Sequence, residues 1–273
     1  MAGKLYLIPT PIGNLKEVSS RFFDVVNEVA YVACEDTRNT SKLLQLLGIS
    51  KKCFSCHEHN ENEASKQIIA DLLSGKDIGY CSDAGYPCIS DPGHLLVKKC
   101  IENNIVVVPI SGPNAFLNAL IGSGLDTDHF YFYGFLSPKS TQRQGELESL
   151  KNLSSTLIFY EAPHRINETL LDMYKVLGNR NICVARELTK MYEEFIRTNL
   201  EDLATNPREF KGELVVIVEG YKIETAEDDY SQYIKEVDEL ISLGLTTKSA
   251  IAALAAIKKL NKNKLYKLYI NKD

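Results

Sequence analysis

Short apolar runs alternate with amphipathic stretches of helical length over the first 125 residues, and this alternation constrains the fold more than any other feature. The runs typical of buried strands are 5–8, 29–34, 78–82 and 105–110. The stretches predicted to be helical are 21–27, 41–47, 63–73, 94–102 and 115–121. Because strands that alternate with such helices form βαβ units, we predict an α/β domain with a mainly parallel sheet over residues 1–125.

The second half of the chain alternates in the same way but begins with an aromatic segment at Phe130. Its predicted strands are 156–160, 182–185, 193–197 and 214–218, and its predicted helices are 143–150 and 166–176. We therefore expect a second, unlike α/β domain over residues 126–221. Residues 222–273 are predicted to form an acidic linker and a small helical domain, with amphipathic helices at 246–254 and 262–269.

Length and composition agree with a soluble protein of about two domains, since the chain has 273 residues and 44% of them are hydrophobic. No apolar stretch approaches the roughly 18 residues that cross a membrane. The apolar run near the N-terminus is interrupted by Pro9 and lacks a small-residue cleavage site, so we expect no signal peptide. Seven cysteines, an odd number, favour reduced thiols in the cytoplasm.

The charge of the chain is uneven. The formal net charge is −5, which argues against coating nucleic acid by bulk electrostatics. Residues 258–273 nevertheless hold six lysines and one aspartate, so this tail carries +5 and the rest of the chain −10. An acidic body with a basic tail is compatible with a nucleic-acid partner but does not require one.

Glycine, proline and small polar residues cluster directly after four of the predicted strands of the first domain. The clusters are residues 9–14, 35–38, 83–87 with 90–93, and 111–115. Each cluster alone is typical of an ordinary turn. In a parallel sheet, however, the carboxyl ends of the strands share one edge, where ligands bind. Together the four clusters predict a ligand cleft at that edge.

Several known motifs are absent or incomplete. Residues Cys53-Phe54-Ser55-Cys56-His57 match the pattern of c-type haem attachment, and His59 lies nearby. Haem attachment requires an exported protein, and no second Cys-x-x-Cys pair completes a zinc site, so we predict a surface loop before a helix and no metal. A Walker loop, a G-x-G-x-x-G motif and a G-x-S-x-G nucleophile elbow are all missing from the sequence, which disfavours nucleotide hydrolysis, dinucleotide redox chemistry and serine hydrolysis.

Paired charges follow three predicted strands, at residues 35–38, 161–165 and 186–190. Charges at such places are costly to bury, so they are either solvated or functional. Two interpretations stay open at this point. The charges form ordinary salt bridges at loop ends, or they line a cleft that grips phosphates and positions a reacting hydroxyl.

Seven segments in the right order resemble one known family. They are Ile8-Pro9-Thr10-Pro11-Ile12-Gly13-Asn14-Leu15, Glu35-Asp36-Thr37-Arg38, Ser82-Asp83-Ala84-Gly85, Ser90-Asp91-Pro92-Gly93, Tyr160-Glu161-Ala162-Pro163-His164-Arg165, Ala185-Arg186-Glu187-Leu188-Thr189-Lys190 and Gly212-Glu213. The chain resembles the ribosomal small-subunit RNA methyltransferase I family of the tetrapyrrole-methylase superfamily. Members of that family methylate the ribose 2′-hydroxyl of a cytidine in 16S rRNA.

The resemblance implies two unlike α/β domains of the tetrapyrrole-methylase type, with S-adenosylmethionine in the cleft between them and a small C-terminal helical appendage. It implies cofactor contacts at Pro11, Ile12, Gly13, Asp83, Ala84, Gly85, Ile89, Ser90, Ser111, Gly112, Pro113, Tyr160, Glu161, Ala162, Glu213 and Leu214. Tyr86 and Cys88 depart from the family, which usually has threonine and an aliphatic residue there. The implied partners are 16S rRNA in the small ribosomal subunit and a second copy of the chain in a homodimer.

A ribose hydroxyl is a poor nucleophile, so a general base or a cation that favours the alkoxide is expected in the cleft. The candidates are Glu35, Asp36, Asp91, Glu161, His164, Glu187 and Lys190, and we favour Glu187 and Lys190, with Glu161 as a further candidate. Predicted RNA phosphate contacts are Arg38, Lys139, Arg143, Arg165 and Arg186. Two alternatives stay open: methylation of a small tetrapyrrole, and a non-catalytic module that binds S-adenosylmethionine.

Overall fold

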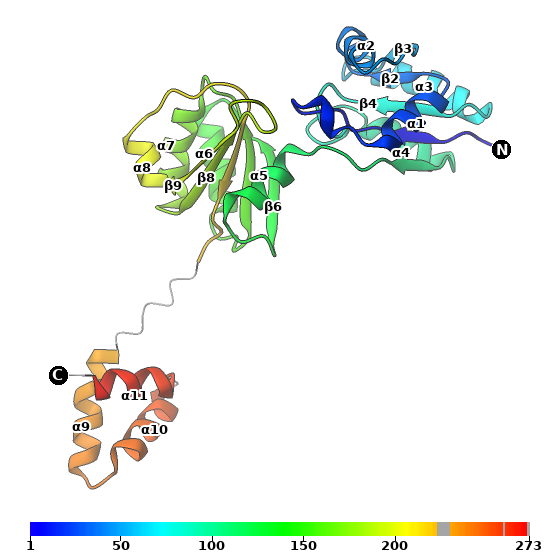
Figure 1. The fold of residues 1–273 in the computed structure, drawn as a ribbon. Coiled ribbons are helices and arrows are strands. Elements are labelled where there is room, and N and C mark those ends of the chain that lie inside the picture. The colour runs from blue at the N-terminus through cyan, green and yellow to red at the C-terminus, as the bar shows by residue number, and fades with distance from the viewer. Residues whose placement is uncertain (223–229, 259, 272–273) are drawn as a thin grey trace. The chain divides into compact units, whose positions relative to one another are not determined.

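The structure is a computed structural model that describes residues 1–222, 230–258 and 260–271 (Figure 1). It forms two compact units, Met1–Tyr221 and Lys222–Asp273. The first unit holds two five-stranded sheets, and the second is helical. Part of the predicted acidic linker falls on residues 223–229, outside the described residues. In the described ranges, no helix is long and apolar enough to cross a membrane.

The first sheet is parallel throughout, which confirms the prediction for this half of the fold. Its strands in spatial order are β3 (Cys53–Ser55), β2 (Val32–Cys34), β4 (Ile78–Cys81), β1 (Leu5–Leu7) and β5 (Val107–Pro109). Along the chain, β1 is followed by η1 (Leu15–Glu17) and α1 (Ser20–Glu28). The strands β2, β3 and β4 are followed by α2 (Thr37–Leu46), α3 (Glu61–Leu73) and α4 (His94–Glu102), respectively. Because the strands are parallel, the loops that follow them meet at one edge of the sheet.

Helices cover both faces of this sheet, as the apolar runs predict. On one face Leu5 packs with Leu96 of α4 and with residues of α3. On the other face Ile8 packs with Phe22 of α1 and with residues of α2. A strand sends successive side chains to opposite faces, so runs that are apolar at every position belong to a sheet buried on both sides.

Side-chain caps fix the start of two helices at the carboxyl edge of the first sheet. Asp36 accepts a hydrogen bond from the backbone amide of Arg38 at the start of α2. Asn114 does the same for the amide of Leu117 at the start of α5 (Ala115–Ser123). Such caps satisfy amides that the first helical turn leaves free. Both helices therefore begin at fixed positions beside the predicted cleft.

The second sheet is mixed. Its strands in spatial order are β6 (Phe130–Phe135), β7 (Thr156–Glu161), β10 (Leu214–Val218), β8 (Asn181–Arg186) and β9 (Glu194–Asn199). β6 and β7 are parallel, whereas the other neighbours are antiparallel. One face is covered by α6 (Ser140–Leu150), α7 (Ile166–Leu177) and α8 (Leu200–Thr205). The first unit therefore contains two unlike α/β lobes, as predicted.

Helix α5 covers the opposite face of the second sheet (Figure 1), although the predicted boundary at residue 125 assigns it to the first lobe. Ala119 and Leu120 of α5 pack against Ile158 of β7 and Ile217 of β10. The helix follows β5 in the chain, so it joins the two lobes. Sequence periodicity identifies the helix but not the sheet that buries it.

One local prediction is wrong. Residues 53–57 were expected to be a surface loop, but Cys53–Ser55 is strand β3 and pairs with β2. The Cys56 side chain that follows is fully buried in the first lobe. All seven cysteines are free thiols. In the described residues, no group of three or more histidine, cysteine or acidic side chains is arranged to hold a metal ion.

The second unit is a small helical domain with its own core. It consists of η2 (Tyr230–Tyr233), α9 (Ile234–Ser242), α10 (Thr247–Lys258) and α11 (Lys262–Ile270). Its buried apolar side chains include Val237 of α9, Ile251 of α10 and Leu265 of α11. The two helices predicted in this tail are confirmed, and α9 occupies part of the stretch expected to be a linker or an exposed helix.

Candidate active site

A cavity of about 410 Å³ lies in the first unit, between the loops at the carboxyl edge of the first sheet and the second sheet. This volume lies within the range of roughly 300–1,000 Å³ that small-molecule sites occupy. Ten of the sixteen predicted cofactor contacts line it: Ile12, Ala84, Gly85, Ile89, Ser90, Tyr160, Glu161, Ala162, Glu213 and Leu214. The cavity is therefore where the sequence places the cleft.

The other six predicted cofactor contacts lie outside the cavity wall: Pro11, Gly13, Asp83, Ser111, Gly112 and Pro113. The backbone amide of Gly112 donates to the hydroxyl of Tyr86 at 2.8 Å, so the Tyr86 side chain, which lines the cavity, reaches across to that loop. Asp83 accepts a hydrogen bond from Asn39 at 2.7 Å. The two hydrogen bonds therefore hold together the loops beside the cavity, and the six residues do not form its surface.

Nine residues of the cavity wall were not among the predicted cofactor contacts: Tyr86, Asp91, Asn114, Ala115, Phe135, Pro163, Leu188, Gly212 and Val215. Most directly follow or adjoin predicted contacts in the sequence, so a wider window around each motif would have found them. Phe135 is different, because it ends β6, a strand that was not predicted.

Strained backbone is concentrated around this cavity. Among the described residues, five other than glycine have positive φ. Cys88 (71°) and Ser90 (61°) belong to one loop beside the cavity, and Glu187 (51°) and Thr189 (66°) belong to another. The left-handed region costs an ordinary L-residue about 1–2 kcal/mol. Strain of this kind persists where the surroundings enforce it and clusters at functional sites.

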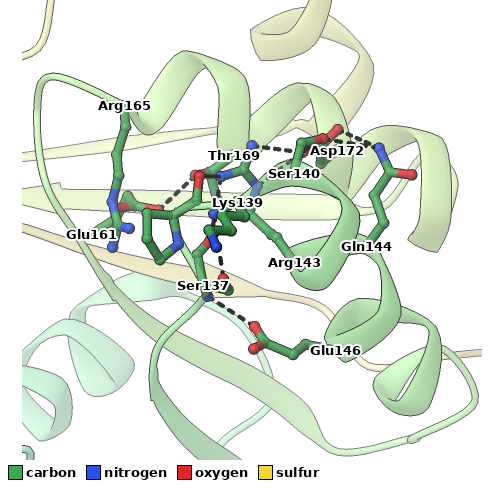
Figure 2. Close-up of polar contacts among 11 residues, drawn as sticks. Ser137, Lys139, Ser140, Arg143, Gln144, Glu146, Glu161, Arg165, Thr169 and Asp172 are labelled. Carbon is green, nitrogen blue, oxygen red and sulfur yellow. Dashed lines mark hydrogen bonds and ion pairs between the residues drawn. The ribbon is translucent and has the colours of Figure 1, made fainter.

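Glu161 ends β7 at the cavity wall, and its carboxylate is fully engaged (Figure 2). One oxygen accepts hydrogen bonds from the Ala162 amide, at 2.7 Å, and from the Arg165 guanidinium. The other accepts from the hydroxyl of Thr169 at 2.6 Å. A buried carboxylate with this set of donors anchors the turn into α7. The charges of this segment therefore form an ordinary salt bridge at the end of a loop, which was one of the two interpretations of the sequence.

Glu187, Lys190 and Glu213 form an ion cluster in which Glu213 lines the cavity, whereas the two favoured catalytic residues, Glu187 and Lys190, do not. The Lys190 ammonium donates to Glu187 at 2.9 Å and to Glu213 at 3.0 Å. The hydrogen bond from Lys190 holds the pKa of the Glu187 carboxyl below its ordinary value. Partial burial opposes the charged form of Lys190, but its bonds to Glu187 and Glu213 raise its pKa on balance. Both predicted catalytic groups are therefore charged at neutral pH and held by one another.

The acidic residues after β2 and β4 differ in their surroundings. Asp36 is ion-paired with Arg38, whose side-chain hydrogen bond lowers the Asp36 pKa to about 2. Burial and the nearby charge of Asp83 raise the pKa of Glu35. Burial is also the largest of the effects that raise the pKa of Asp91 to about 6. Asp91 lines the cavity, whereas Glu35, Asp36 and Asp83 do not.

Of the predicted phosphate contacts, Arg143 is buried, so the prediction for this residue is wrong. Its guanidinium is buried, 1% exposed, and ion-paired with Asp172 at 2.6 Å (Figure 2). It also donates to the carbonyls of Ser137 and Pro138. Because this buried group already has protein partners on each of its nitrogens, it is not available to an RNA phosphate.

The remaining predicted phosphate contacts reach the surface to different degrees. Lys139 and Arg38 are exposed, and Arg38 is paired with Asp36. Arg186 is half-buried and paired with Glu194, and Arg165 is mostly buried and paired with Glu161. Surface pairs of this kind are weak and can exchange partners. Arg38, Lys139 and Arg186 are thus the cations that a bound phosphate could reach most easily.

Comparisons with known proteins define the class first. Residues 4–204 match the family model of the tetrapyrrole (corrin/porphyrin) methylases. A solved structure, titled uroporphyrin-III C-methyl transferase from Thermus thermophilus complexed with S-adenyl homocysteine, aligns with a TM-score of 0.56 over 80% of this chain and 97% of that one. Its sequence is 15% identical, so this likeness supports the fold alone.

Sequence relatives then define the family. The chain is 45% identical to the ribosomal RNA small subunit methyltransferase I of Halalkalibacterium halodurans, over 98% of this chain and 94% of that protein. It is 44% identical to the protein of the same name from Bacillus subtilis, with the same coverage of 98% and 94%. The chain therefore belongs to the ribosomal RNA small subunit methyltransferase I family, within the tetrapyrrole methylases.

Proposed function

We propose that this protein binds S-adenosylmethionine in the cavity and transfers its methyl group to the ribose 2′-hydroxyl of a cytidine in 16S rRNA. The observation that carries the proposal is the cavity itself, a preformed site at the shared edge of the strands in a chain of this family. We further propose that the protein works as a cytoplasmic homodimer on the small ribosomal subunit.

The residues around the cavity fit this cofactor in size, polarity and backbone shape. Gly85 and Gly212 line the cavity with positive φ, a backbone shape that glycine adopts without strain, and a Cβ atom on Gly212 would clash with the Glu187 carboxylate. Asp91 and Glu213 give the cavity wall a negative charge, which suits a cationic sulfonium, and Phe135 and Val215 offer apolar surface. The hydroxyl oxygen of Thr189, beside Gly13 next to the cavity wall, is buried and has no hydrogen-bond partner among the described residues.

When bound, S-adenosylmethionine supplies a methyl group on a sulfonium that is already activated for transfer. The protein therefore needs to align the acceptor hydroxyl with that methyl group, exclude water and accept a proton. Glu187 and Lys190 stay our predictions for catalysis, in a positioning role. Of the ion cluster, Glu213 lines the cavity whereas Glu187 and Lys190 do not, so the cluster can orient the Glu213 carboxylate toward a polar group of the acceptor.

Binding of RNA to an acidic protein requires local cations. Arg38, Lys139, Arg165 and Arg186 remain the proposed phosphate contacts on the first unit, and the basic tail is a further candidate. Because the chain as a whole carries −5, we expect recognition of a folded site on the assembled subunit rather than general RNA affinity.

The experiment that tests the proposed function follows labelled methyl from S-adenosylmethionine into small ribosomal subunits that lack the modification. Parallel reactions contain naked 16S rRNA and a porphyrinoid precursor. Label on the ribose oxygen of one cytidine in the subunits is the expected result. Label on the porphyrinoid alone would favour the small tetrapyrrole as substrate. Binding of the cofactor without transfer to any acceptor would favour the non-catalytic module.

A further inference from the structure

Three carboxylates line the cavity, and two of them are already committed to partners. Glu161 is held by an arginine, a hydroxyl and a backbone amide. Glu213 is paired with the Lys190 ammonium. Asp91 forms no ion pair with any residue that the structure describes. Asp91 is therefore the carboxylate of the cavity wall that remains able to take up a proton at low cost.

The loop that carries Asp91 is fixed to the helices behind it. The backbone amides of Gly93 and Leu96 each donate to one carboxylate oxygen of Glu61 on α3, both at 3.1 Å. Gly93 has a φ of 120°, and a Cβ atom at this position would lie 2.3 Å from the ring of Tyr80. These contacts fix the backbone just after Asp91, so Asp91 is carried on a segment anchored to α3 and β4.

The titratable groups that face Asp91 come from both lobes. Glu35 follows β2, Asp83 follows β4, and Cys88 belongs to the same loop as Asp91. Tyr160 faces it from β7 of the second lobe. Burial raises the pKa of the Cys88 thiol to about 11 and of the Tyr160 phenol to about 12, so both are neutral. The described groups around Asp91 are thus acidic or neutral.

These surroundings explain the proton affinity of Asp91. Burial and the charge of Glu35 outweigh a hydrogen bond from the Ser82 hydroxyl, and Asp83 adds to them. The result is the pKa of about 6 described above. A general base is most effective when its pKa lies near the working pH, because it is then ionised but still attracts a proton. Glu187, whose pKa is lowered by Lys190, is a weaker base.

We propose that Asp91 is the group that accepts the proton of the ribose hydroxyl during methyl transfer, an assignment that rests on the proposed function. The ribose oxygen forms its bond to the methyl carbon while the carbon–sulfur bond breaks and its electron pair stays on sulfur. The hydroxyl proton passes to a carboxylate oxygen of Asp91 and is later released to water. Atoms and charge balance without any other reactant.

The test compares Asp91→Asn with Asp91→Glu in the full chain, with Asp24→Asn as the matched control on the exposed face of α1. Asp91→Asn keeps the size of the side chain but cannot take the proton, so kcat for small subunits should fall at least ~100-fold. The affinity for S-adenosylhomocysteine, measured by calorimetry, should change by less than about fivefold. Asp91→Glu should recover part of the rate, and Asp24→Asn should behave as wild type.

The pH dependence provides a second test with a defined sign. A base must be ionised, so kcat/KM of the wild type should fall as the pH drops through about 6. In carbon-13 NMR of the free protein, one carboxyl resonance that titrates near pH 6 should be present in the wild type and missing from Asp91→Asn. This measurement does not depend on turnover or on the bound cofactor.

Three results would overturn the assignment. Rates of Asp91→Asn within a few-fold of wild type would show that another group takes the proton. A loss of S-adenosylhomocysteine affinity as large as the loss of rate would make Asp91 a cofactor contact instead. If the wild type itself fails to label small subunits, the proposed function is wrong, and the assignment of Asp91 is wrong with it. If wild type and Asp91→Asn label the subunits equally well, only the assignment of Asp91 is wrong.

Discussion

Arg143 is the residue whose role changes most between sequence and structure, because a cation expected at the RNA surface proves to be a buried part of the second lobe. Burial would raise the pKa of Asp172, but hydrogen bonds from Gln144, Ser140 and Arg143 outweigh it and lower that pKa. The ion pair fixes the segment between β6 and α6. Lys139, at the start of α6, is thereby presented from a rigid turn.

We predict that Arg143→Met destabilises the protein, since it leaves the Asp172 carboxylate buried without its cation. Breaking a buried pair in this way costs about 3–5 kcal/mol, which urea unfolding would measure. Arg38→Met, at an exposed pair, should leave the unfolding midpoint unchanged. A midpoint for Arg143→Met equal to that of wild type would mean that the pair contributes nothing.

The lowered pKa of Asp172 adds a pH dependence to this prediction. A carboxyl with a lower pKa in the folded state stabilises the fold fully above its ordinary pKa near ~4. That contribution disappears as the pH falls through the lower folded value. The loss of stability between about pH 5 and the acid range should therefore be smaller in Asp172→Asn than in wild type.

Gly13 shows how closely the two lobes approach beside the cavity. It has a φ of 153°, and a Cβ atom there would lie 2.5 Å from Cγ of Lys190 in the other lobe. Gly13→Ala should therefore displace Lys190, cost about 2–4 kcal/mol in stability and weaken binding of S-adenosylhomocysteine. Gly48→Ala is the control: its φ is 73° but a Cβ meets nothing within 4 Å. It should cost only about 1–2 kcal/mol and leave binding intact.

At the scale of elements, α5 is the helix that couples the lobes, and it packs closely on β9. A Cβ atom on Gly122 would lie 2.5 Å from the ring of Phe195. Arg197 lies over that ring at 5.1 Å and donates to the carbonyls of Gly122 and Ser123. Arg197 therefore ties the Phe195 ring to the end of α5, which limits how far the ring can move away from Gly122.

This close approach decides whether a glycine-to-alanine substitution in the helix raises or lowers the stability of the protein. Alanine in place of glycine stabilises a free helix by about 0.5–1 kcal/mol, whereas overpacking costs about 1–3 kcal/mol. Gly122→Ala should thus be destabilising, and Gly145→Ala on α6, where a Cβ meets nothing within 4 Å, should be stabilising. Thermal unfolding of both variants tests the pair. A higher Tm for Gly122→Ala would show that α5 does not pack on β9 as described.

The elements that were predictable are those with a strong apolar pattern. The limits of α4 and β10 agree with prediction residue for residue, because α4 is amphipathic and β10 is an unbroken apolar run with clear boundaries. β3 is not predicted because Cys53-Phe54-Ser55 is not an apolar run, unlike the equally short β1 and β2. For the cavity, the sequence indicates the loops that surround it. It does not indicate which side chains face inward, because such positions depend on contacts between loops, as when the Gly112 amide donates to the Tyr86 hydroxyl.

At the scale of the whole molecule, the two units have separate cores, and basic charge is concentrated at the end of the second unit. The first unit carries the cavity and both sheets, whereas the tail of the second unit, residues 258–273, carries +5. Of the described lysines in this tail, Lys262, Lys264 and Lys267 are exposed on α11. Such lysines attract phosphates in a manner that depends on salt. The division predicts that cofactor binding and RNA affinity can be separated.

We therefore predict that a chain ending at Tyr221 retains S-adenosylhomocysteine affinity but binds small ribosomal subunits more weakly than the full chain. Each phosphate contact that is lost lowers the slope of log affinity against log salt by roughly 0.7–0.9, so the truncated chain should also be less sensitive to salt. The full chain with Lys262, Lys264 and Lys267 replaced by glutamine separates charge from shape, because the helical core around Leu265 is left in place. If the triple variant matches the truncation, the tail acts through its charge; if both bind as wild type, the second unit has no part in recognising the subunit.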